Sequence, residues 1–143
     1  LKKTHRSIVK LAFDGLIHKQ YQGALALERL ANEVRVLQHL QACGCDFVPR
    51  VIRYSLETMT VVLTNCGNPV QRLSDAKIKE LFSQLHVFGV VHEDASLRNI
   101  TYRNADGRFC LIDFEFASLQ QTMHTAHPIE RLIDDLEALI DEA

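Results

Sequence analysis

A polar segment in the second half of the chain carries the residue types that handle phosphate groups and metal ions. His92, Asp94 and Asn99 lie close together between two apolar stretches, and Asp113 ends a further apolar run. Phosphoryl transfer needs positioning and charge neutralisation more than covalent help from the protein. Carboxylate and amide oxygens are also ligands that Mg²⁺ prefers. The pattern therefore points to a site for a phosphorylated substrate and Mg²⁺.

Each of these residues also has a purely structural explanation, since Asp94 can cap a turn, Asn99 can begin a strand and Asp113 can end one. Their joint occurrence between apolar flanks favours a functional site. The spacing His92-x-Asp94-x4-Asn99, followed by Asp113-Phe114, resembles the catalytic and metal-binding core of the protein-kinase-like superfamily. The resemblance implies that Asp94 is the catalytic base, that Asn99 and Asp113 bind Mg²⁺, that ATP is the phosphate donor, and that His92 supports the loop.

The first half of the chain agrees with this resemblance, which assigns Lys19 as the ATP-binding lysine and Glu33 as its partner. On a helix, Glu33 lies between Leu30 and Leu37, on or beside the apolar face, where a carboxylate is costly unless it is paired. Lys19 on a neighbouring strand is a suitable partner. Lys10 is a competing lysine on an earlier strand. In the alternative interpretation, Glu33 reaches water and Lys19 is an exposed strand residue.

Two further sets of residues are assigned by the resemblance alone. Residues 62–67 correspond to the strand and connecting segment against which adenine stacks, so Asn65 and Gly67 are expected at the ATP site. Asp135, or its neighbour Asp134, is expected to hold the backbone of the catalytic loop from a helix near the end of the chain.

The sequence departs from the usual kinase pattern before the first strands and in the catalytic loop. No G-x-G-x-x-G motif is present, and residues 1–6 are predicted to be too short for a phosphate-covering hairpin. Glu93 replaces an arginine that reads a phosphorylated activation loop, and Ser96 replaces the usual catalytic-loop lysine. Arg98 matches an alternative position from which a cation neutralises the transferred phosphate. It can equally be a solvated loop charge or a backbone clamp.

A fourth departure from the kinase pattern follows Asp113. Glu115 stands where most protein kinases have glycine, and the run Ile112-Asp113-Phe114-Glu115 resembles the metal-binding strand of choline and aminoglycoside kinases. Loss of this glycine removes a backbone pivot, so an in-and-out flip of the segment is not expected.

Hydrophobic periodicity and turn residues predict the elements that position these groups. The predicted fold is α+β, a reduced bilobal protein-kinase-like domain over residues 1–143. It has a small antiparallel β N-lobe (about 1–66) and a truncated, mostly helical C-lobe (about 67–143). The predicted strands are 7–13, 16–21, 48–56, 60–65, 100–103 and 109–114, and the predicted helices are 24–41, 74–88 and one that begins at Pro128.

Composition excludes several other classes of protein. The chain has 143 residues, 24% of them charged, and a formal net charge of -2, so there is no electrostatic case for nucleic acid or an anionic membrane. No apolar run approaches the roughly 20 residues of a membrane span. Four cysteines without a secretory signal favour reduced thiols in the cytoplasm.

Together these features predict an ATP-dependent phosphotransferase, of the serine/threonine protein-kinase type, that acts on a hydroxyl of a protein or a small molecule. The alternative is a pseudokinase, a nucleotide-binding scaffold without catalysis, favoured by the missing glycine loop, Glu93 and Ser96. A homo-oligomer or a regulatory partner remains open.

Overall fold

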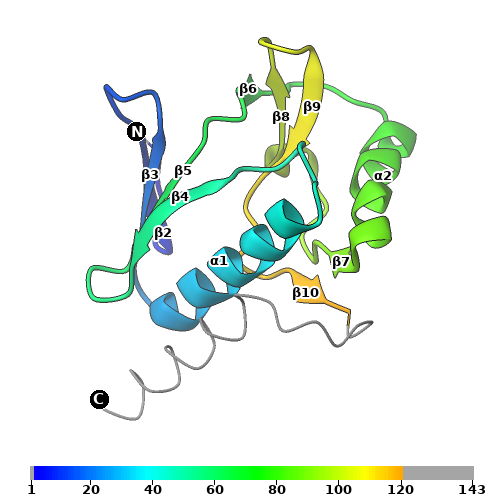
Figure 1. The fold of residues 1–143 in the computed structure, drawn as a ribbon. Helices are drawn as coiled ribbons and strands as arrows, with labels where there is room; N and C mark the ends of the chain where they lie inside the picture. Colours follow the sequence, from blue (N-terminus) through cyan, green and yellow to red (C-terminus); the bar gives the residue numbers. More distant parts are fainter. Residues whose placement is uncertain (1, 121–143) are drawn as a thin grey trace.

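The structure is a computed structural model, and residues 2–120 are described. Residues 2–63 form a five-stranded antiparallel sheet, in the order β1-β2-β3-β5-β4, with one long helix, α1, beside it. The following residues form a second group with a shorter helix and two small antiparallel sheets, β6-β8-β9 and β7-β10 (Figure 1). The bounds are β1 Lys2–Lys3, β2 Ser7–Leu11, β3 Ile17–Tyr21, α1 Ala26–Ala42, β4 Val51–Ser55, β5 Thr60–Leu63, β6 Asn68–Pro69, α2 Asp75–Ser83, β7 Val90–Val91, β8 Ile100–Arg103, β9 Arg108–Leu111 and β10 Ser118–Leu119, with 3-10 turns at Gln84–Phe88 and Leu97–Asn99.

Helix α1 is the central element of the core. An apolar stripe at three- and four-residue spacing buries Leu30, Val34 and Leu37 completely. The face of the helix beside this stripe also packs inward, and it buries the charged side chains of Arg29 and Glu33. Because charged side chains are buried only when they are paired, this second stripe must meet oppositely charged groups.

The second half begins with a well-capped helix. Ser74 adopts an extended backbone, and its hydroxyl accepts the N–H of Lys77 at 3.1 Å, as expected of an N-cap residue. The helix tightens into a 3-10 turn and ends at Gly89. The φ of Gly89 is 74°, a left-handed conformation that glycine adopts easily because it has no Cβ. Strands β8 and β9 then form a hairpin, and the backbone N–H of Leu111 donates to Phe47 O at 2.9 Å, which joins the two halves.

Most of the predicted elements are present, and the α+β class is confirmed. The start of the chain contains an element that was not predicted: β1 pairs with β2, Lys2 with Val9 and Lys3 with Ile8, so residues 2–3 form a short hairpin with the first predicted strand. The predicted strand 109–114 also ends earlier, at Leu111. Its continuation is interrupted because Asp113 has a φ of 67°.

The expectation of a mostly helical second half does not hold over residues 68–120, where short strands alternate with helical turns. The helix expected from Pro128, with Asp134 and Asp135, lies outside the described residues. Among residues 2–120, no helix is long and apolar enough to cross a membrane.

Candidate functional site

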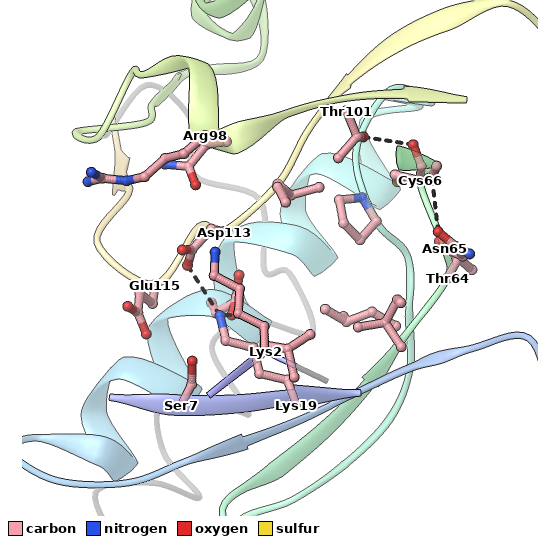
Figure 2. Close-up of a pocket in the computed structure, with 18 of the residues that line it drawn as sticks. Lys2, Ser7, Lys19, Thr64, Asn65, Cys66, Arg98, Thr101, Asp113 and Glu115 are labelled. Carbon is pink, nitrogen blue, oxygen red and sulfur yellow. Dashed lines mark hydrogen bonds and ion pairs between the residues drawn. The ribbon is translucent and has the colours of Figure 1, made fainter. Parts of the chain in front are cut away.

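A cleft of about 420 Å³ opens between the five-stranded sheet and the second group of elements. One wall comes from β1, β2, β3 and the end of β5, and the other comes from the loop before β8 and the segment after β9 (Figure 2). Its polar lining includes most of the residues singled out from the sequence: Lys19, Glu33, Asn65, Gly67, Arg98, Asn99 and Asp113.

Lys19 connects the two walls of the cleft. Its Nζ lies 2.8 Å from Glu33 Oε1 and 3.2 Å from Asp113 Oδ1. Burial acts to lower the pKa of this lysine, but the two carboxylates outweigh it and raise the pKa above its ordinary value. Lys19 is therefore a fixed cation that faces the cleft and holds Asp113 beside it. Lys10, the competing lysine, is exposed and pairs with His18 across the sheet.

Glu33 is fully engaged on both of its oxygens. Oε1 accepts from Lys19 and from the hydroxyl of Tyr21, and Oε2 accepts the backbone N–H of Phe114 at 2.6 Å. Burial and the Glu33 carboxylate raise the pKa of Tyr21 well above its usual value, so its hydroxyl remains a donor. The carboxylate of α1 thus fixes both the lysine of β3 and the backbone next to Asp113.

His92 supports the loop that contains Asp94. It is buried between the rings of Phe82 and Phe114, at centroid distances of 4.9 and 4.8 Å. Its Nε2 lies 2.8 Å from Ile112 O, and its Nδ1 accepts the N–H of Asp94 at 3.2 Å. These partners assign a neutral ring with the proton on Nε2, because Nδ1 must accept.

Asp94 lies beside the cleft, and its carboxylate accepts hydrogen bonds from Arg98 and Asn99. Arg98 Nη2 is 2.8 Å from each of its carboxylate oxygens. Hydrogen bonds from Arg98 and then Asn99 lower the pKa of Asp94, although partial burial opposes this effect. Asp94 is therefore ionised at neutral pH. Neither Asp94 nor His92 lines the cleft, whereas Arg98 does.

The amide of Asn99 has a defined orientation. Its Nδ2 donates to the backbone oxygen of Asp94 at 2.9 Å and to Asp94 Oδ2 at 3.2 Å, which leaves the amide oxygen without a donor in residues 2–120. Ile112 N donates to Asn99 O at 2.9 Å, so Asn99 and Asp113 are held on neighbouring segments. One carboxylate oxygen of Asp113 is bound by Lys19, and the other makes no contact with a donor in this range.

This set of oxygens fits Mg²⁺, which takes one or two carboxylates from protein and completes its octahedron with water and phosphate. Residues 2–120 contain no group of three or more His, Cys, Asp or Glu side chains able to hold a metal by themselves. A metal at Asn99 and Asp113 would therefore depend on oxygens from a substrate.

The segment between β5 and β6 closes the far end of the cleft. Gly67 N donates to Asn65 Oδ1 at 2.9 Å, and Thr101 Oγ1 donates to Cys66 O at 2.7 Å (Figure 2). Gly67 has a φ of 97°, and a Cβ there would lie 2.0 Å from Tyr102 O. Only glycine lets this segment approach β8 so closely.

Sequence reasoning missed the residues that hold Glu115. Arg29 Nη1 lies 3.1 Å from Glu115 Oε2, and Asn32 Nδ2 donates to the backbone oxygens of Glu115 and Ala117 at 3.0 and 2.9 Å. The available signal was the spacing of Arg29 and Glu33, which share one face of the helix.

The predicted support of the catalytic loop by Asp135 is not tested, because Asp135 lies outside the described residues.

Comparisons with known proteins concern the fold alone. No protein-family model and no curated protein matches the chain. Among solved structures, the crystal structure of the Rio2 kinase-ADP/Mg²⁺-phosphoaspartate complex from Chaetomium thermophilum is similar, with a TM-score of 0.60 and 18% sequence identity. The match covers 99% of this chain and 54% of that chain, so this chain spans about half the length of the Rio2 structure. The chain therefore has a kinase-like fold.

Proposed function

We propose that this protein binds ATP with Mg²⁺ in the cleft and transfers the γ-phosphate to a hydroxyl group, most readily one on a protein. The observation that carries the proposal is the bridge made by Lys19, whose ammonium group contacts both Glu33 and Asp113 at the wall of the cleft. A lysine held in this way presents a fixed positive charge to a phosphate chain and keeps a carboxylate within reach of the same phosphates.

The chemistry divides among the residues on the two walls. Asp94 would accept the proton of the acceptor hydroxyl as its oxygen bonds to the γ-phosphorus, while the bond to the bridging oxygen breaks and ADP leaves. Arg98 lines the cleft next to Asp94, so its guanidinium would stabilise charge on the transferred group. Asn99 and Asp113 would hold Mg²⁺, which neutralises charge on the phosphates when it is bound.

The same proposal includes a two-lobed arrangement. The five-stranded sheet with α1 would form the N-lobe, and the elements after Asn65 would form a reduced C-lobe, with the cleft between them. The similarity to the fold of Rio2 kinase, whose structure contains ADP and Mg²⁺, supports this arrangement.

A second candidate function is nucleotide binding without phosphoryl transfer. It is favoured by the contact between Arg98 and Asp94, in which both carboxylate oxygens accept from the same guanidinium nitrogen. Unless Arg98 moves toward a phosphate, Asp94 is a poor acceptor for a substrate proton. Formation of a phosphorylated product separates the two candidates.

The test is calorimetric titration with ATP, with and without Mg²⁺, on the protein and on the variants Asp113→Asn and Asp106→Asn. Asp106 is an exposed carboxylate that pairs with Arg103 and does not line the cleft, so it is a matched control. We expect Mg²⁺-dependent binding that Asp113→Asn removes and Asp106→Asn retains. Absence of ATP binding by the folded protein would refute the proposal. Binding without transfer to any hydroxyl, measured by phosphate release and by mass spectrometry, would favour the second candidate.

A further inference from the structure

Three backbone donors in the turn between β1 and β2, those of Thr4, Arg6 and Ser7, are occupied. Thr4 Oγ1 accepts the N–H groups of Arg6 and Ser7, both at 3.1 Å, and Thr4 N donates to Ser7 O at 2.8 Å. Gln22 fixes the turn from outside, because its side chain donates to Thr4 O and its backbone N–H donates to Arg6 O, both at 2.8 Å. A glycine-rich loop binds phosphates through free backbone N–H groups. The N–H groups of Thr4, Arg6 and Ser7 are not free, so an anion at this hairpin has to rely mainly on side chains for its recognition.

Strand register directs one side chain of β1 into the cleft. Lys2 pairs with Val9, and Val9 pairs with Lys19, so these three residues form one row across three strands. Directly opposed residues of antiparallel strands point to the same face. Lys2, Val9 and Lys19 all line the cleft, and Figure 2 shows the side chains of Lys2 and Lys19 in the same cavity as Asp113. Neighbouring strands lie about 4.8 Å apart, which separates the backbones of Lys2 and Lys19 by roughly 10 Å.

The next residue along β1 faces the other way. Lys3 pairs with Ile8 and does not line the cleft, as the alternation of side chains along a strand requires. Two adjacent, exposed lysines of one short strand thus differ only in the face of the sheet to which they point.

Within the described residues 2–120, Lys2 also differs from the other cations of the cleft in having no ion-pair partner. Four cationic side chains line the cleft. Three of them are engaged: Lys19 by Glu33 and Asp113, Arg98 by Asp94, and Arg6 by Glu115, with Nη1 to Oε1 at 3.5 Å. Lys2 makes no ion pair within residues 2–120. Its charge is therefore available to an anion in the cleft at no cost to another contact.

We propose that the ammonium group of Lys2 binds the distal phosphates of a nucleoside triphosphate, in place of the backbone N–H groups that a glycine-rich loop would supply. This inference rests on the proposed function and adds to it a residue that distinguishes triphosphates from monophosphates. Lys2 and Lys19 contact the phosphate chain from two strands of the same sheet. Val9, on the strand between them, is uncharged.

The experiment compares Lys2→Gln with Lys3→Gln, which change the net charge equally. Calorimetry with ATP and with AMP, both in the presence of Mg²⁺, measures the contribution of the distal phosphates. Because the substitution removes a charged hydrogen bond to the distal phosphates, we expect Lys2→Gln to weaken ATP binding by about tenfold or more. AMP binding by Lys2→Gln, and binding of either nucleotide by Lys3→Gln, should remain at the level of the unsubstituted protein.

Each other outcome counts against the inference. Equal ATP affinities for Lys2→Gln and Lys3→Gln would overturn it and leave the proposed function intact. Equal weakening of ATP and AMP by Lys2→Gln would also overturn it, because AMP has no distal phosphate. If the unsubstituted protein binds no ATP, the proposed function fails and this inference fails with it.

Discussion

The guanidinium of Arg29 and the carboxylate of Glu115 form a buried ion pair, with Nη1 3.1 Å from Oε2 and side-chain exposures of only 6% and 3%. The remaining donors of Arg29 bind the backbone oxygens of Ala24, Gln22 and Arg6. The pair joins α1 to the segment that follows Asp113. Burial raises the pKa of Glu115, and the nearby cations Lys19 and Arg29 oppose that effect. The backbone N–H of Phe114 also donates to Glu33 on α1. Two successive residues, Phe114 and Glu115, are therefore bound to this helix.

Substitution of Glu115 should therefore destabilise the fold strongly. Glu115→Ala would leave the Arg29 charge buried without compensation, and we expect the free energy of unfolding to fall by about 3–5 kcal/mol. Glu115→Gln should cost less, because its amide oxygen can still accept from Arg29. Urea denaturation measures both. The control is Asp46→Ala, which breaks the exposed ion pair with Arg108 (exposures 71% and 41%) and should change stability little. A cost for Glu115→Ala no larger than for Asp46→Ala would contradict a structural role for the buried pair.

The contact between Lys19 and Glu33 should show strong energetic coupling. In a double-mutant cycle with Lys19→Met and Glu33→Gln, we expect a coupling energy of about 2–3 kcal/mol, near the upper end for residues in one network. Both side chains are almost fully buried, at 8% and 1% exposure, so little of the interaction is screened by solvent. The comparison cycle uses Lys77 and Glu80, a pair 3.5 Å apart on the exposed face of α2, where the coupling should be about 0.5 kcal/mol or less. Similar couplings in the two cycles would show that burial does not strengthen the Lys19 contact.

The contact between Lys19 and Glu33 could be predicted from the sequence because two local rules agreed. Helical spacing put a carboxylate on a buried face, and a neighbouring strand offered a lysine. Two lysines were candidates for Glu33, and Lys19 was preferred to Lys10 because its strand lies nearer to the helix in the sequence. Asn99 and Asp113 were assigned by the resemblance of their spacing to the kinase-like core, and they do lie on neighbouring segments.

The ion pair of Arg29 and Glu115 could not be predicted in the same way. A charged residue on a helix most often faces solvent, so the spacing that puts Arg29 on the face of Glu33 was too weak a signal to predict that Arg29 is buried against the segment after Asp113. The hairpin of β1 and β2 was missed because two strand residues and a turn built by Thr4 carry no glycine or proline signature. The strand end at Leu111 depends on the positive φ of Asp113, a conformation that tertiary contacts impose on a non-glycine residue.

Substitution of Gly67 should be far more costly than substitution at another glycine of positive φ. A Cβ at Gly67 would lie 2.0 Å from Tyr102 O and 2.8 Å from the Cα of Arg103, both backbone atoms that cannot rotate away. A Cβ at Gly15 (φ 79°) meets nothing within 4 Å. We expect Gly15→Ala to cost about 1 kcal/mol from backbone strain alone. Gly67→Ala should cost about 1–3 kcal/mol beyond that, because β8 has to move. Thermal and urea denaturation of both variants measure the difference, and equal losses would show that the segment from Asn65 to Gly67 can retreat from β8 freely.

The contact between Arg98 and Asp94 should be visible in the titration of the aspartate. The hydrogen bonds from Arg98 and Asn99 hold the pKa of Asp94 below its ordinary 3.8, so folding stabilises the ionised form. This contribution to stability is present above pH 3.8, and it is lost as the pH falls through the lower pKa of the folded protein. Arg98→Gln removes the larger of the two hydrogen-bonding partners. We expect it to move the pKa of Asp94 upward, toward the ordinary value, and to shift acid unfolding to higher pH.

Carboxyl ¹³C NMR on protein labelled at aspartate measures this pKa directly, without any assumption about activity. The matched control is Arg108→Gln, which removes the same charge at the ion pair with Asp46, away from the cleft. In that variant Asp94 should titrate as in the unsubstituted protein. If Arg98→Gln also left the titration unchanged, the guanidinium would not be the group that keeps Asp94 ionised. Arg98 would then be free to contact a phosphate at no cost to Asp94. The upward shift we expect means instead that a phosphate that attracts Arg98 would also raise the proton affinity of Asp94, as the proposed role of Asp94 as a base requires.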